Sequence, residues 1–115
     1  IIQLHWYSDG GDPENTWGSD GTNYNVLQIL KSEYNLPIMF TEIGIDPDFT
    51  TAQAQTYIST TIPELYAAQS TYNVIGFNWY ELYDDPTGTF GLLTSSATPK
   101  PIYATMKAAI AAAQQ

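Results

Sequence analysis

Three apolar, β-prone runs recur along the chain, each followed by a Gly/Asp/Pro-containing loop and then by a segment whose apolar residues have helical spacing. The runs span Ile1 to Tyr7, Ile38 to Ile43 and Val74 to Leu82. The helical segments span about Tyr24 to Tyr34, Thr50 or Thr51 to about Gln69, and Ile102 to Ala113 with Pro101 in the first turn. This alternation predicts parallel βαβ units, and therefore one α/β region over residues 1–115. Pro63 is expected to kink or interrupt the second helix.

The loops that follow the strands are long and polar, whereas the loops that precede them, "NLP" and "STYN", are short. In parallel α/β folds the functional groups gather at the carboxyl ends of the strands. Strict alternation along each strand predicts three shared faces: Gln3 with His5 and Tyr7, Ile38 with Phe40 and Glu42, and Ile75 with Phe77, Trp79 and Glu81. If the strands are neighbours, Tyr7, Glu42 and Trp79 should converge.

The charge balance excludes several classes of partner. Twelve Asp and Glu residues oppose three lysines, and arginine is absent. Nucleic-acid binding needs clustered basic residues, so it is excluded, and anionic membranes and phosphorylated substrates are disfavoured. No apolar run reaches the roughly 18 to 20 residues of a membrane span. A neutral or cationic ligand fits better, and the three Trp, nine Tyr and four Phe residues suit a surface that stacks on a flat, partly polar molecule.

Glu42 stands out because it ends the apolar stretch "PIMFTEIG". A buried carboxylate is costly unless it is paired or hydrogen-bonded, so Glu42 is either held by the structure, in contact with water at the strand end, or functional. His5 is the single histidine and could act as a base or be structural. No cysteine is present, and the loop aspartates do not match a calcium loop, so no metal site is expected.

Other chemistry lacks its motifs. The sequence contains no G-x-G-x-x-G, Walker or G-x-S-x-G pattern, so nucleotide cofactors and serine hydrolysis are not expected, and no cofactor is predicted. Trp79 could stack on a ligand together with other aromatic residues near the loops, or could simply belong to the core. The other members of this aromatic group are Trp6, Trp17, Tyr80 and Tyr83.

Taken together, "LHWY", "PIMFTEIGID" and "VIGFNWYELYDDP" followed by "FGLLTSSATPKPIYATMKAAI" resemble the last three βα units of clan A glycoside hydrolases. Members of that clan are retaining enzymes on a (β/α)8 barrel, and the likeness covers nearly the whole chain. The order of Glu42, Trp79, Phe90-Gly-Leu and Lys100-Pro-x-Tyr103 carries most of the resemblance.

The resemblance implies a role for each matching residue. Glu42, at the end of the seventh barrel strand, would be the nucleophile that forms a glycosyl-enzyme intermediate. Tyr7 and His5, at the end of the sixth strand, would orient Glu42 or touch the sugar. The implied contacts to a β-linked glycan substrate are Trp79, as the floor of a sugar subsite, together with Glu81 and Trp17.

The sequence departs from the clan in two respects. In the clan, the acid/base glutamate comes from the fourth strand in an Asn-Glu sequence, and no Asn-Glu occurs in this chain. A (β/α)8 barrel also takes about 250 residues in eight units. We therefore expect a C-terminal portion, strands six to eight, of an incomplete barrel whose N-terminal part carries the acid/base. The composition, rich in Thr, Ser, Asn and Gly with few lysines, suggests a secreted microbial protein.

Two alternatives remain open at this point. The first is a non-catalytic carbohydrate-binding barrel fragment that uses Trp79, Trp17 and the tyrosines without chemistry. The second is a small flavodoxin-like domain, which would need a phosphate site at a helix N-terminus. The aspartate-rich loops disfavour this second alternative because aspartate repels phosphate.

Overall fold

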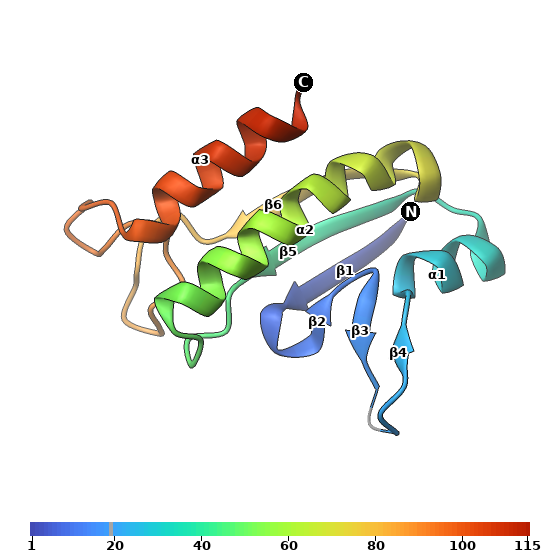
Figure 1. Cartoon of the computed structure of the whole chain (residues 1–115), viewed down its shortest axis with the longest axis horizontal. Helices are drawn as coiled ribbons and strands as arrows, with labels where there is room; N and C mark the ends of the chain where they lie inside the picture. The colour runs from blue at the N-terminus through green and yellow to red at the C-terminus, as the bar shows by residue number, and fades with distance from the viewer. Residues whose placement is uncertain (19) are drawn as a thin grey trace.

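The structure is a computed structural model that describes residues 1–18 and 20–115, with the side chain of Trp17 outside the description. Three parallel strands form its main sheet in the order β1-β5-β6 (Figure 1): β1 (Ile2–Tyr7), β5 (Ile38–Gly44) and β6 (Val74–Tyr80). The predicted strands are confirmed to within two residues at each end. Because β5 lies between the other two, its carboxyl end is flanked by residues from both neighbours.

Three helices follow the strands: α1 (Val26–Tyr34), α2 (Thr51–Tyr72) and α3 (Pro101–Ala113). Thr50 begins α2 through a capping box with Gln53, in which each side chain accepts from the other residue's backbone N–H. Helix α2 continues through Pro63, so the expected interruption does not occur. No helix in the described part of the chain is long and apolar enough to cross a membrane.

The helices pack against one face of the sheet. Leu27 of α1 and Leu65 of α2 share a buried cluster with the β5 residues Ile38, Phe40 and Ile43. A second cluster joins α2 to α3, and its main members are Ile58, Ile62, Ile102 and Met106. Burial of these side chains is the main source of stability for the helix-covered face.

The first loop contains structure that the sequence did not reveal. After the short 3-10 helix η1 (Ser8–Gly10), the strands β2 (Gly11–Asp12), β3 (Asn15–Trp17) and β4 (Asn23–Tyr24) form a small antiparallel sheet. Figure 1 shows this sheet beside α1, below the carboxyl end of β1. These strands are two or three residues long, which is too short for an alternating pattern to be recognised in a sequence.

Candidate functional site

A β-bulge in the central strand decides where Glu42 points. Leu4 of β1 pairs with Phe40 of β5, but the next residue, His5, pairs with Glu42, so Thr41 has no partner on β1. The register between β5 and β6 also shifts just after Phe40. The Thr41 hydroxyl donates to the Leu4 carbonyl over 3.3 Å and so makes a bond that the interrupted ladder lacks. Bulges of this kind redirect side chains and are frequent next to active sites.

The bulge inverts the alternation of β5. Ile38, Phe40 and Ile43 are all fully buried on the helix-covered face. Glu42, whose side chain is 26% exposed, lies instead on the opposite face with Tyr7. The prediction that Ile38, Phe40 and Glu42 share a face is therefore wrong, because the extra residue shifts the two-residue period by one.

Tyr7 and His5 from β1 surround the Glu42 carboxylate. The Tyr7 hydroxyl donates a hydrogen bond to Glu42 Oε1. His5 Nδ1 lies 3.7 Å from Glu42 Oε2, close enough for an ion pair when the imidazole is protonated. Burial, the hydrogen bond to Glu42 and the charge of Glu42 raise the pKa of Tyr7, in that order of size. Tyr7 therefore remains a protonated donor over the working range of most enzymes.

Two more aromatic rings pack on Tyr7. The ring of Phe90, from the loop after β6, lies edge-on to Tyr7 with a centroid distance of 5.8 Å. Tyr80, at the end of β6, lies 5.6 Å from Phe90 and 6.4 Å from Tyr7, also edge-on. A hollow of about 380 Å³ opens at this point and is lined by Tyr7, Asp9, Asp46, Pro47 and Phe90. Tyr7, which contacts Glu42, thus belongs to an aromatic group with Tyr80 and Phe90.

Trp79 does not join this group. It pairs with the buried Ile43 and packs against both core clusters on the helix-covered face, with its indole Nε1 buried and unpartnered. The expected convergence of Trp79 with Tyr7 and Glu42 is wrong, because the bulge brings Glu42 to one face of the sheet while Trp79 stays on the other. Tyr80, one residue later, occupies the face that Trp79 was expected to share.

Gly44 is a site residue that the sequence analysis missed. A Cβ atom at this position would lie 2.4 Å from the Tyr80 carbonyl oxygen and 3.1 Å from Tyr7 Cε1. Only glycine therefore lets the end of β5 fit between these two residues. The sequence shows a glycine after "PIMFTEI", but the residues that crowd it, Tyr7 and Tyr80, belong to other strands.

The two remaining predicted sugar contacts are only partly described. Glu81 follows β6, and its buried Oε1 makes no hydrogen bond. Loss of solvation and the nearby charges of Asp85 and Asp84 raise the pKa of Glu81, while Lys100 opposes them. Trp17 lies in β3, but its side chain is outside the described residues. Across the described residues, no group of three or more acidic or histidine side chains could hold a metal ion.

No known family profile and no curated protein sequence matches the chain. Among solved structures, the chain is similar to a family 39 glycoside hydrolase from the gut symbiont Bacteroides cellulosilyticus WH2, with 25% identity and a TM-score of 0.64. That match covers 96% of this chain and 26% of the other.

A β-glucosidase solved without ligand is also similar, with 21% identity and a TM-score of 0.57. The match covers 87% of this chain and 30% of the β-glucosidase, and at this identity it shows the fold alone. The chain therefore spans less than a third of each of these two structures. It is similar in fold, over nearly its whole length, to part of a glycoside hydrolase.

Proposed function

We propose that the full-length protein is a retaining β-glycosidase, and that this chain supplies strands six to eight of its (β/α)8 barrel. The observation that carries the proposal is the placement of Glu42. It lies near the carboxyl end of the central parallel strand, on the face away from the helices, with the Tyr7 hydroxyl bonded to one oxygen and His5 near the other. Barrel enzymes hold their reactive groups at this end.

In this proposal Glu42 is the nucleophile. Its carboxylate attacks the anomeric carbon, the glycosidic bond breaks, and a covalent glycosyl-enzyme forms that water then hydrolyses. Tyr7 fixes the orientation of the carboxylate through its hydrogen bond to Oε1. His5 lies on the Oε2 side, where it can orient the carboxylate or contact the sugar.

The acid/base carboxyl group must then come from the rest of the protein. A retaining enzyme needs it about 5 to 5.5 Å from the nucleophile, and the Asn-Glu sequence that the resemblance associates with it is absent from this chain. The sheet face that carries Glu42 also includes His5, whose side chain is 65% exposed. An N-terminal part of the barrel would cover this face and bring the second carboxyl group to Glu42.

The substrate in this proposal is a neutral β-linked glycan. A net charge of −9 disfavours anionic ligands, and Tyr80 and Phe90 provide an aromatic surface beside Tyr7. Tyr80 takes over the aromatic role that the sequence analysis gave to Trp79. Glu81 and Trp17 remain predicted sugar contacts, and secretion remains a prediction from composition.

The experiment is covalent trapping in the full-length protein. A 2-deoxy-2-fluoro aryl β-glycoside slows hydrolysis of the intermediate, so a retaining enzyme accumulates its glycosyl adduct. We expect intact-mass analysis to show one added glycosyl group and peptide mapping to place it on Glu42. Glu42→Gln should abolish both the adduct and turnover.

The matched control is Glu33→Gln, which changes an exposed glutamate of α1 to the same amide and should leave trapping unchanged. An adduct on another residue, or turnover that survives Glu42→Gln, would refute the nucleophile assignment. Glycan binding without any turnover in the wild-type protein would instead favour the non-catalytic carbohydrate-binding alternative.

A further inference from the structure

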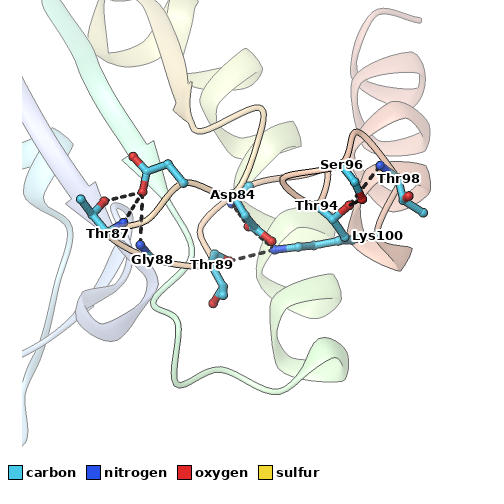
Figure 2. A network of polar contacts seen from close by, with 10 residues as sticks. Asp84, Thr87, Gly88, Thr89, Thr94, Ser96, Thr98 and Lys100 are labelled. Carbon is cyan, nitrogen blue, oxygen red and sulfur yellow. Dashed lines mark hydrogen bonds and ion pairs between the residues drawn. The ribbon is translucent and has the colours of Figure 1, made fainter.

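A partly buried ion pair holds the loop between β6 and α3. Lys100 Nζ lies 2.5 Å from Asp84 Oδ1, and the two side chains are only 21% and 15% exposed. Lys100 Nζ also donates to the Thr89 carbonyl over 2.9 Å, and Figure 2 shows Lys100 reaching across the loop to both partners. A pair this far removed from water is costly to break, because the remaining charge loses its compensation.

Asp84 uses the same oxygen to hold the next part of the loop. Its Oδ1 accepts a hydrogen bond from the Gly91 backbone N–H over 2.9 Å, and its own N–H donates to the Leu93 carbonyl over 3.0 Å. A Cβ at Gly91 would lie 2.3 Å from the Asp84 nitrogen, so this close approach requires glycine. The ion pair is thus bonded to Thr89 and Gly91, the two residues that flank Phe90 in the chain.

Phe90 connects this loop to the proposed site. Its ring lies edge-on to both Tyr7 and Tyr80, and Tyr7 in turn donates to Glu42. Edge-to-face contacts depend on the ring positions, so a displaced Phe90 would leave Tyr7 with a gap on one side. The contacts form one continuous chain from Lys100 and Asp84 through Phe90 and Tyr7 to Glu42.

We propose that Lys100 and Asp84 are positioning residues: their ion pair holds Phe90 against Tyr7 and thereby keeps the Tyr7 hydroxyl on Glu42. The expected effect on kinetics rests on the proposed function, whereas the effect of the ion pair on Phe90 and Tyr7 does not depend on it. Lys100 acts on Tyr7 and Glu42 through Phe90, and its charge also opposes the raised pKa of Glu81.

The same loop supplies a matched control. Asp85 is exposed, and its Oδ1 accepts bonds from the Thr87 N–H at 2.7 Å, the Thr87 hydroxyl at 2.5 Å and the Gly88 N–H at 3.2 Å. Figure 2 shows Thr87 and Gly88 in a separate turn away from Lys100. Asp85→Ala therefore removes a comparable set of loop bonds while leaving the bonds to Thr89 and Gly91 in place. Because Gly88 lies against the Phe90 ring, we expect a small effect of this variant on Phe90.

The test uses the full-length protein with 3-fluorotyrosine incorporated only at Tyr7, read by fluorine NMR. We expect Lys100→Met to shift the Tyr7 resonance and to lower the raised pKa of Tyr7 towards its ordinary value. Lys100→Arg, which keeps the charge and donors, should restore much of the wild-type signal. Asp85→Ala should change both the resonance and the pKa much less than Lys100→Met does.

Kinetics on an aryl β-glycoside provide the second readout. We expect kcat of Lys100→Met to fall about 10- to 100-fold with KM changed much less, because a small misplacement of an orienting group acts on the chemical step. Should Lys100→Met fail to fold, Phe90→Leu removes the ring contact while leaving the ion pair, and the same Tyr7 shift is expected from it.

An unchanged Tyr7 resonance in folded Lys100→Met, or in Phe90→Leu, overturns the positioning role. A Tyr7 shift equal in Asp85→Ala and Lys100→Met also overturns it, since any loop disturbance would then suffice. Suppose that the wild-type protein shows no hydrolysis, while the Tyr7 resonance shifts in Lys100→Met and much less in Asp85→Ala. The proposed function then fails and the positioning role stands.

Discussion

Glu42 on strand β5 and Glu64 on helix α2 are both partly buried, yet their neighbours are opposite in character. Glu42 accepts a hydrogen bond from Tyr7 and has His5 within 3.7 Å. Glu64 has a buried Oε2 without a hydrogen-bond donor and lies near the acidic Asp12 and Glu14. Burial alone therefore does not identify a reactive carboxylate. Glu42 has a hydrogen-bond donor and an imidazole beside its carboxyl group, whereas the acidic neighbours of Glu64 favour the protonated form of that side chain.

The electrostatics of Glu64 follow from this environment. Burial, then the charge of Asp12, then a hydrogen bond with Asp12 raise the pKa of Glu64 from 4.5 to about 7. Asp12 lies in β2, so the pair links the first loop to helix α2.

Replacing Glu42 or Glu64 by glutamine tests whether the two carboxyl groups differ in function. In the full-length protein, Glu42→Gln should reduce kcat/KM by more than about 1,000-fold, as expected when a group central to covalent catalysis is lost. Glu64→Gln should leave kcat/KM within about threefold, because Glu64 belongs to helix α2, on the face of the sheet opposite to Glu42. Steady-state assays with an aryl β-glycoside measure both, and comparable losses in the two variants would contradict the distinction.

Tyr7→Phe removes the donor from Glu42 but keeps the ring that packs on Tyr80 and Phe90. We expect kcat to fall about 100-fold, which is the usual scale for one well-placed donor in a catalytic site. The free energy of unfolding should change by only about 1 kcal/mol. Parallel assays and urea unfolding measure the two effects, and full activity in the variant would show that Glu42 does not need this donor.

Gly44→Ala tests the crowding around Glu42. The added methyl would overlap the Tyr80 carbonyl and press on the Tyr7 ring, so we expect a loss of about 1 to 3 kcal/mol in stability and a drop in activity. Gly21→Ala is not a suitable control because Gly21 has a positive φ of 80°. Gly10→Ala is better, since a Cβ there meets only the Trp6 ring at 3.6 Å or beyond. Equal losses in Gly44→Ala and Gly10→Ala would argue against specific crowding at β5.

The pH dependence of stability tests Glu64. Its pKa is about 7 in the folded protein and near 4.5 when unfolded, so its contribution is complete below about pH 4.5 and is lost as the pH rises through 7. Glu64→Gln cannot ionise, so it should flatten this decline and be more stable than wild type at pH 8. We expect the free energy of unfolding of Glu64→Gln to exceed that of wild type by about 1 kcal/mol at pH 8. This is well below the value that the whole pKa difference would give, because Glu64 is partly solvated.

Urea unfolding at pH 5 and pH 8 measures this effect, with Glu33→Gln on the exposed face of α1 as the control. Equal pH dependence in wild type and Glu64→Gln would show that Glu64 is not strained by its acidic neighbours.

Much of this molecule could be predicted from residue patterns. The three apolar runs and the helical spacing after each of them predict the parallel sheet, and Pro101 marks the start of α3. The carboxylate at the end of "PIMFTEIG" indicates the candidate site without knowledge of any neighbour. These features are local, since a period of two or 3.6 residues and a helix cap depend on a few consecutive residues.

Pairing between strands decided the rest. The bulge at Thr41 turns Glu42 away from Phe40, and the two-residue period alone predicts the opposite face for it. For the same reason Tyr80, and not Trp79, lies beside Tyr7. A bulge depends on how two strands pair, and here the pair brings together residues more than 30 positions apart in the chain, such as Thr41 and Leu4. Local sequence patterns predict where a polar group occurs, but the register of three strands together determines which face receives it.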